Sequence, residues 1–198
     1  MLQKVNVVVF DFDGTISASD ANLEFFKYCF KHSIRPWLFF PCVIAGAIGA
    51  CLNPRGVWWR QTIRCFITPK MVKDFSADVV KLHKQNRFGW AKELVAKESS
   101  KGNKVLLISA SPDYLIPGLV ADMKFDAVFC SKMNREKPYK YEFLCWGKNK
   151  VVALDNWALE HKYIPNVVRS YSDSKNDLPL MEIAHEQVWI DPKTGLRK

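Results

Sequence analysis

Two aspartates one residue apart are the first residues in the chain whose types suggest chemistry. Asp11 and Asp13 directly follow 5–10, a valine-rich run that predicts a strand buried on both faces. Ligands of open α/β sheets bind at the carboxyl ends of parallel strands. One carboxylate there could act as nucleophile and Mg²⁺ ligand, and the other could pass a proton to and from a leaving oxygen. The alternative is a turn whose acids cap the next helix.

A hydroxyl follows a second apolar strand. The run 104–109 ends in Ser109, which could bind a phosphate oxygen together with backbone N–H groups of the following turn. Ser111 stands two residues further on, so the sequence leaves open which of the two hydroxyls meets the phosphate. A serine that merely caps the next helix is the alternative.

Two more acids and two lysines are further candidates for the same site. Asp173 and Asp177 follow a third apolar run, 167–171. One of them could bind a metal, while the other orients that ligand or holds a lysine. Lys148 and Lys150 open a predicted helix and could supply the ammonium, although a lysine at a helix start is usually a solvated surface charge.

The elements around these residues alternate between strand and helix. This alternation predicts an α/β fold with a Rossmann-like parallel sheet flanked by helices. Residues 19–87 break the rhythm with helical spacing and no clear strand, which predicts an inserted all-helical cap, while 1–18 plus 88–198 form the core. The predicted strands are 5–10, 104–109, 127–130 and 167–171, and the predicted core helices are 90–101, 114–123 and 148–161.

The order and spacing of these residues resemble the four motifs of the haloacid dehalogenase superfamily. The resemblance implies a Mg²⁺-dependent phosphatase that forms an aspartyl-phosphate on Asp11, with Asp13 as general acid and then base. The matching segments are Phe10-Asp11-Phe12-Asp13-Gly14-Thr15, the strand ending in Ser109, a lysine at 148 or 150, and Ser172-Asp173-Ser174-Lys175-Asn176-Asp177.

The same resemblance implies roles for the remaining residues. Ser109, Gly14 and Thr15 would bind the phosphoryl group, and Lys150 would neutralise its charge, with Lys148 as the reserve candidate. Magnesium would be held by the following residues: Asp11, the carbonyl of Asp13, and Asp173. Asp177 would hold the metal ligand and lysine in place.

The predicted cap has an unusual composition. Residues 36–52 carry no charge, and 25–73 contain no Asp or Glu but eight Lys and Arg, Arg55 among them. An apolar run with aromatic residues near its ends and basic residues on both sides is typical of a segment in a membrane interface. The alternative is a cap whose apolar helix packs on its neighbours. The residues expected to contact the membrane are Trp37, Trp58, Trp59 and Arg60.

Within the superfamily, the pattern resembles the phosphatidylglycerophosphatase C type. The likeness rests on the apolar, basic-flanked insert, on 109–112, on 171–175 and on the tail 188–192. It implies dephosphorylation of phosphatidylglycerophosphate at an anionic membrane surface, the cytoplasmic face of the inner membrane. The alternative is a soluble phosphatase of a small metabolite such as phosphoserine or a sugar phosphate. A non-enzymatic membrane-binding protein on this fold is disfavoured by the intact acid set.

Composition and charge bear on the kind of ligand that the protein binds. The chain has 198 residues and a net charge of +9, with no motif for nucleic-acid binding, so an anionic substrate or membrane better explains the charge. Six cysteines without a C-x-x-C pair give little support for zinc and suggest reduced thiols in a cytoplasmic protein. No feature of the sequence points to an obligate protein partner.

Overall fold

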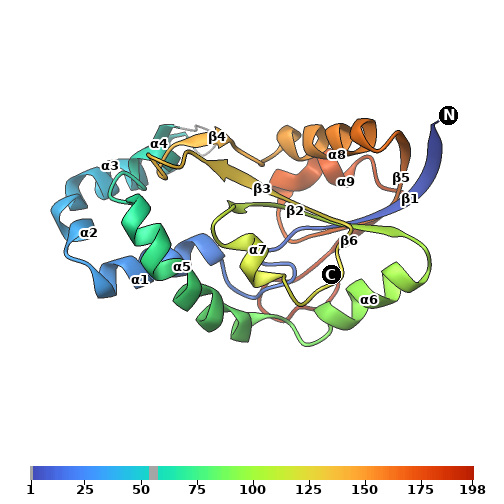
Figure 1. Ribbon diagram of the computed structural model, residues 1–198, viewed down its shortest axis with the longest axis horizontal. Helices are drawn as coiled ribbons and strands as arrows, with labels where there is room; N and C mark the ends of the chain where they lie inside the picture. Colours follow the sequence, from blue (N-terminus) through green and yellow to red (C-terminus); the bar gives the residue numbers. More distant parts are fainter. Residues whose placement is uncertain (1, 54–57) are drawn as a thin grey trace.

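A six-stranded sheet lies at the centre of the computed structural model, which describes residues 2–53 and 58–198 (Figure 1). The strand order is β4-β3-β2-β1-β5-β6, parallel except for the antiparallel pair β3–β4. This arrangement confirms the predicted α/β fold. The strands are β1 (Gln3–Phe10), β2 (Lys104–Pro112), β3 (Ala127–Met133), β4 (Tyr141–Phe143), β5 (Tyr163–Ser172) and β6 (Glu186–Trp189).

The valine-rich run forms β1 because both of its faces are buried. Successive side chains of a strand point to opposite faces, so Val7 and Val9 enter one hydrophobic cluster while Val8 and Phe10 enter the other. In Figure 1, α8 (Lys148–Glu160) and α9 (Leu178–Met181) cover one face of the sheet. The opposite face is covered by α6 (Ala91–Ser100) and α7 (Ile116–Leu119).

Between β1 and β2 the chain forms a group of helices, from Ala21 to Asn86, that lies at one end of the sheet and is called the helical insert below (Figure 1). The first helix starts where the Asp20 side chain accepts a hydrogen bond from Leu23 N–H, and α5 starts where Thr68 does the same for Met71 N–H. The insert contains α1 (Ala21–His32), α2 (Arg35–Leu38), α3 (Phe40–Leu52), α4 (Trp58–Thr62), α5 (Pro69–His83) and the 3₁₀ turn η1 (Lys84–Asn86).

The uncharged run 36–52 is divided between α2 and α3. One face of α3 packs closely on α4, as shown by Gly49, where an added Cβ would collide with the Trp58 side chain. Its other face leaves an apolar stripe exposed, made of Phe40, Ile44, Ile48 and Leu52. Within residues 2–53 and 58–198, none of the helices combines the length and apolar character that crossing a bilayer requires. Arg55 lies outside the described residues.

Two details differ from the predictions. The expected helix 114–123 is wrong in extent, since only Ile116–Leu119 is α-helical. Pro117 and Gly118 both lie within that short turn and disfavour a longer helix. The short strands β4 and β6 were not predicted, because three or four residues carry too little periodic pattern.

Candidate active site

The carboxyl ends of β1, β2 and β5 meet at one edge of the sheet, beside the helical insert. A pocket of about 390 Å³ opens there. It brings together residues far apart in the sequence: acids that follow β1 and β5, a lysine from α8 and groups of the insert. Its wall includes Asp11, Asp13, Gly14, Ser111, Lys150, Asp173, Asp177 and Arg60.

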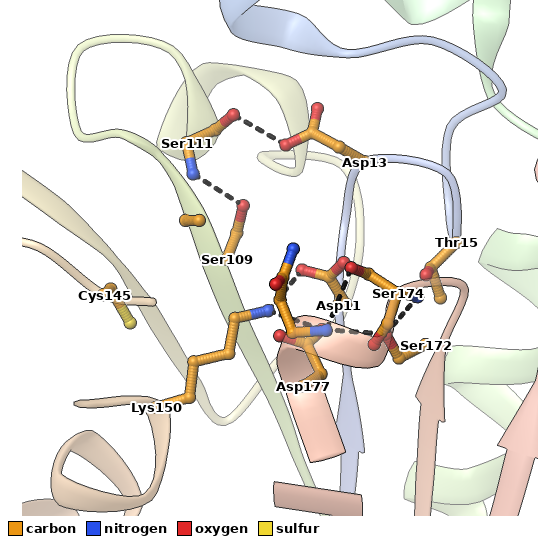
Figure 2. A network of polar contacts seen from close by, with 12 residues as sticks. Asp11, Asp13, Thr15, Ser109, Ser111, Cys145, Lys150, Ser172, Ser174 and Asp177 are labelled. Carbon is orange, nitrogen blue, oxygen red and sulfur yellow. Dashed lines mark hydrogen bonds and ion pairs between the residues drawn. The ribbon is translucent and has the colours of Figure 1, made fainter. Parts of the chain in front are cut away.

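Lys150 joins two buried carboxylates at the base of this pocket (Figure 2). Its Nζ donates to Asp11 Oδ1 and to Asp177 Oδ2, each at 2.8 Å, and the lysine is 1% exposed. Ser172 also donates to Asp177 Oδ2, at 2.7 Å. The buried ammonium is thus paired on two sides, and Asp11 is held in one orientation.

The charges of this network shift one another's pKa values. Burial raises the pKa of Asp11 well above its usual range, and Asp177 and Asp13 add to the rise against the opposing effect of Lys150. Burial alone would lower the pKa of Lys150, but Asp11 and Asp177 outweigh it and raise that pKa. The two neighbouring acids therefore stabilise the charged form of Lys150.

The two candidate lysines differ in position. Lys150 faces the sheet together with Ala153, Leu154 and Trp157 of α8, whereas Lys148 is exposed at the start of the helix. Residues two apart on a helix point in nearly opposite directions, so only one of the two can reach Asp11.

Asp13 is held by the insert and by β2. Its Oδ1 accepts a hydrogen bond from Ala21 N–H at 2.7 Å, and its Oδ2 accepts one from Ser111 Oγ at 2.6 Å. Burial, and secondly the charge of Asp20, raise the pKa of Asp13 to about 7. A group that titrates near neutral pH can both give and take a proton, as general acid–base catalysis requires.

The two serines of β2 have different surroundings. Ser111 lines the pocket, and its hydroxyl donates to Asp13 (Figure 2). Ser109 is fully buried and accepts a hydrogen bond from Ser111 N–H at 3.1 Å, which leaves its own O–H available as a donor. The sequence left open which of these two hydroxyls meets the phosphate, and it did not predict the contact of Ser111 with Asp13.

Gly14 and Thr15 both lie against Asp173. Gly14 has φ +72°, and a Cβ there would collide with the Asp173 carboxylate, so glycine allows the close approach. Thr15 was expected to bind substrate, but it is fully buried and its Oγ1 accepts a hydrogen bond from Asp173 N–H at 3.0 Å. Its observed contact therefore positions Asp173 rather than reaching into the pocket.

The donor set can be tested for its fit to magnesium. Within the described part of the chain, no group of three or more His, Cys, Asp or Glu side chains is arranged to hold a metal. Magnesium, however, commonly takes only one or two protein carboxylates and completes its shell with water and phosphate oxygens. Asp11 and Asp173 line the same pocket and can supply those carboxylates, so the residues fit the ion. The Asp13 carboxylate is engaged by Ser111 and Ala21 instead.

The four residues expected to contact a membrane differ in exposure and in position. Trp37 and Trp58 are exposed on the insert, and Trp59 is partly buried. Arg60 lies on the wall of the active-site pocket, with its guanidinium over the rings of Trp59 and Trp146. Its observed position is therefore beside the candidate site, which the sequence alone did not indicate.

A sequence profile of the haloacid dehalogenase-like hydrolases matches residues 8–182, which include every acid and the lysine of the site. The chain belongs to this family of hydrolases. This membership confirms the superfamily resemblance seen in the sequence motifs.

Individual relatives have low sequence identity to this chain. The chain is 29% identical over 114 residues to a protein of Mycobacterium tuberculosis named as a probable phosphatase, and the match covers 56% of this chain and 40% of that protein. The chain thus spans well under half the length of the curated relatives it matches.

Solved structures share the fold. A protein of unknown function from Bordetella pertussis Tohama I has a TM-score of 0.74 at 15% identity, covering 98% of this chain and 93% of that one. A substrate-bound phosphoserine phosphatase has a TM-score of 0.64 at 15% identity, covering 95% and 87%. At these identities the likeness supports the fold alone.

Proposed function

We propose that this hydrolase removes phosphate from phosphomonoesters through a covalent aspartyl-phosphate on Asp11. The observation that carries the proposal is the buried contact of Lys150 with Asp11 and Asp177 at the base of a pocket that also contains Asp13. Lys150 holds one oxygen of Asp11, so the other oxygen remains available to attack. The ammonium offsets charge that the phosphoryl group brings into the pocket.

The reaction then has two steps. An Asp11 oxygen attacks phosphorus, the ester bond to the alcohol breaks, and protonated Asp13 gives its proton to the departing oxygen. In the second step the Asp13 carboxylate takes a proton from a water molecule, which attacks phosphorus and breaks the bond to Asp11. Inorganic phosphate leaves, and both aspartates return to their starting states.

We assign supporting roles to four other residues. Ser109, with backbone N–H groups of the turn after β2, would donate hydrogen bonds to phosphoryl oxygens, and Ser111 would orient Asp13. Asp11 and Asp173 would hold Mg²⁺, which when bound neutralises phosphoryl charge as a Lewis acid. Asp177 would keep Lys150 in place.

The helical insert is proposed to act as a cap that selects the substrate, because Asn22 and Arg60 of the insert line the same pocket as Asp11. For the substrate we favour a small phosphomonoester, such as phosphoserine or a sugar phosphate. Support comes from the fold shared with phosphoserine phosphatases and from a pocket of about 390 Å³, which suits a metabolite-sized ligand.

A second candidate substrate is a lipid phosphomonoester such as phosphatidylglycerophosphate, hydrolysed at the cytoplasmic face of an anionic membrane. The observation that favours it is the exposed apolar stripe on α3, flanked by exposed Trp37 and Trp58 on a helical insert rich in lysine and arginine. Apolar side chains beside basic residues suit contact with an anionic bilayer surface.

A substrate panel tests both candidates. Phosphate release is measured from phosphoserine, a sugar phosphate and phosphatidylglycerophosphate in mixed micelles, each with Mg²⁺ and again with EDTA. We expect turnover that EDTA abolishes and added Mg²⁺ restores. Preference for the soluble esters supports the small-metabolite proposal, and preference for the micellar lipid supports the second candidate. No turnover of any phosphomonoester would contradict the proposed activity.

A further inference from the structure

A second cavity lies in the helical insert, between α1 and α5, which pack against each other (Figure 1). Its volume is about 230 Å³, and none of the described residues that line it also lines the active-site pocket. Both helices and the 3₁₀ turn η1 contribute to its wall. Its polar lining residues include Glu24, Lys27, Lys31, His83 and Asn86.

The last residue of α5, His83, belongs to this wall with its ring buried, at 1% exposure. Its Nε2 lies 2.9 Å from Ser17 Oγ. Its Nδ1 is buried and has no hydrogen-bond partner within residues 2–53 and 58–198. A buried polar atom without a partner costs free energy, so a group that paired with Nδ1 from the cavity would stabilise this part of the insert.

The hydroxyl proton of Ser17 indicates which kind of group fits. Ser17 Oγ is 2.9 Å from His83 Nε2 but 3.5 Å from its alternative acceptor, Asn86 O. Hydroxyl donors normally lie within about 3.0 Å of an oxygen acceptor, so the Ser17 hydroxyl donates to Nε2. Burial lowers the pKa of His83 and favours its neutral form. The single ring proton then sits on Nδ1, which is a donor in need of an acceptor.

The charges on the wall favour a negative acceptor. Lys27 and Lys31 lie one turn apart on α1 and both line the cavity. Glu24 Oε1 is 3.0 Å from Lys27 Nζ and offsets its charge. Lys31 has no ion pair with a carboxylate in the part of the chain that the structure describes. An N–H donor on the same wall as an unmatched ammonium suits an oxygen that carries negative charge.

The cavity lies beside the two chain segments that join the insert to the core. Segment 15–20 leaves the core and segment 84–88 returns to it, and they run side by side, with Ala18 N–H donating to Asn86 O at 2.9 Å. Ser17 of the first segment contacts the histidine ring, and Asn86 of the second lines the cavity. A ligand bound here would therefore lie at the junction of the insert and the core, apart from the active-site pocket.

We propose that this cavity binds a small oxyanion, held by the Nδ1–H group of His83 and the ammonium of Lys31. Inorganic phosphate and small carboxylates share the chemistry required, an oxygen acceptor with negative charge. A cavity of about 230 Å³ has room for anions of this size. The site is distinct from the proposed catalytic site, and no step of the proposed reaction depends on it.

A titration followed at the histidine rings tests the site directly. The ¹⁵N-labelled protein is titrated with inorganic phosphate, and long-range ¹H–¹⁵N correlation spectra record the ring nitrogens. We expect His83 to carry its proton on Nδ1 in the free protein, and its Nδ1 signal to shift and saturate as phosphate is added. A neutral His83 ring protonated on Nε2 instead would overturn the proposal, because Nδ1 could not donate.

The His83 signals are assigned by elimination, because replacing His83 would also remove its contact with Ser17. The chain has four histidines, and the other three are exposed and can each be replaced by glutamine: His32, His161 and His185. The ring signals that persist in all three variants belong to His83.

Lys31→Met tests the second contact of the anion. Lys31 is exposed, so the variant should fold, which thermal unfolding checks. It should raise the phosphate concentration at half-saturation of the His83 signal by about fivefold, the upper scale for an exposed ion pair. Lys81→Met is the matched control, because Lys81 is exposed on α5 but does not line the cavity, and it should leave half-saturation unchanged.

Equal half-saturation in Lys31→Met and the unmodified protein would overturn the proposal, because the shift would then come from phosphate bound elsewhere, such as the active-site pocket. A parallel titration with malonate distinguishes the two sources of the oxyanion. A saturable shift that Lys31→Met weakens, with either anion, supports the site and identifies the class that it takes. No saturable shift with either anion would overturn the proposal. Because none of these measurements involves turnover, their outcome is independent of the proposed function.

Discussion

Replacing Asp11 with asparagine is expected to lower kcat by at least about 10⁴-fold, the scale of loss when a nucleophile is removed. The amide has nearly the same shape as the carboxylate but cannot form the phosphoryl bond. The fold should persist, because Lys150 keeps its second partner, Asp177. Steady-state turnover with Mg²⁺, together with a thermal unfolding curve, measures both effects.

Asp155→Asn is the matched control for this variant. Asp155 is exposed on α8, so the same change of side chain there should leave turnover within twofold or so of the unmodified protein. A folded Asp11→Asn variant that retains turnover would contradict the nucleophilic role of Asp11.

The second large effect is on stability. Lys150→Met should lower the free energy of unfolding by about 3–5 kcal/mol, the cost of removing one partner from a buried charge pair. The methionine fills similar space, but Asp11 and Asp177 lose the ammonium between them and remain buried. Equilibrium denaturation in urea at neutral pH measures the change.

Lys148→Met provides the comparison on the same helix. Lys148 is exposed at the start of α8, so its replacement should change the free energy of unfolding by no more than about 0.5 kcal/mol. Equal destabilisation by the two variants would contradict the assignment of Lys150 as the buried partner of both acids.

The core sheet and its acids could be predicted because the sequence signal is local. A valine-rich strand followed by two aspartates places those acids at the sheet edge through the geometry of parallel strands. The position of Lys150 was also encoded, since Lys150, Ala153, Leu154 and Trp157 follow the i, i+3, i+4, i+7 spacing of one helix face. Lys148 falls outside that face, a signal that reasoning from motif spacing alone did not use.

The part of the pocket wall formed by Arg60, Tyr141 and Trp146 could not be predicted in the same way. Arg60 comes from α4, Tyr141 from β4 and Trp146 from the loop before α8, and only the path of the helical insert brings them together. In the sequence, Arg60 is one of eight basic residues in 25–73, which contain no Asp or Glu. The contact of its guanidinium with two tryptophan rings depends on tertiary packing, which no local pattern encodes.

The contacts of the apolar run 36–52 could not be predicted from the sequence either. Its composition predicted an interfacial segment, but the sequence did not indicate which residues would be covered. Gly46 and Gly49 bury one face of α3 against α4, and the apolar stripe on the other face stays exposed. Spacing of small residues was present in the sequence, yet the partner helix could not be identified from it.

Trapping the covalent intermediate tests the central claim most directly. Protein reacting with p-nitrophenyl phosphate and Mg²⁺ is quenched in acid within one turnover, digested, and analysed by mass spectrometry, with the unmodified chain and Asp13→Asn side by side. We predict one added phosphoryl group on the peptide that contains Asp11, with more of it in Asp13→Asn because water attack is slowed. Turnover without phosphorylation of that peptide in either protein, or a phosphoryl group on another residue, would contradict the account.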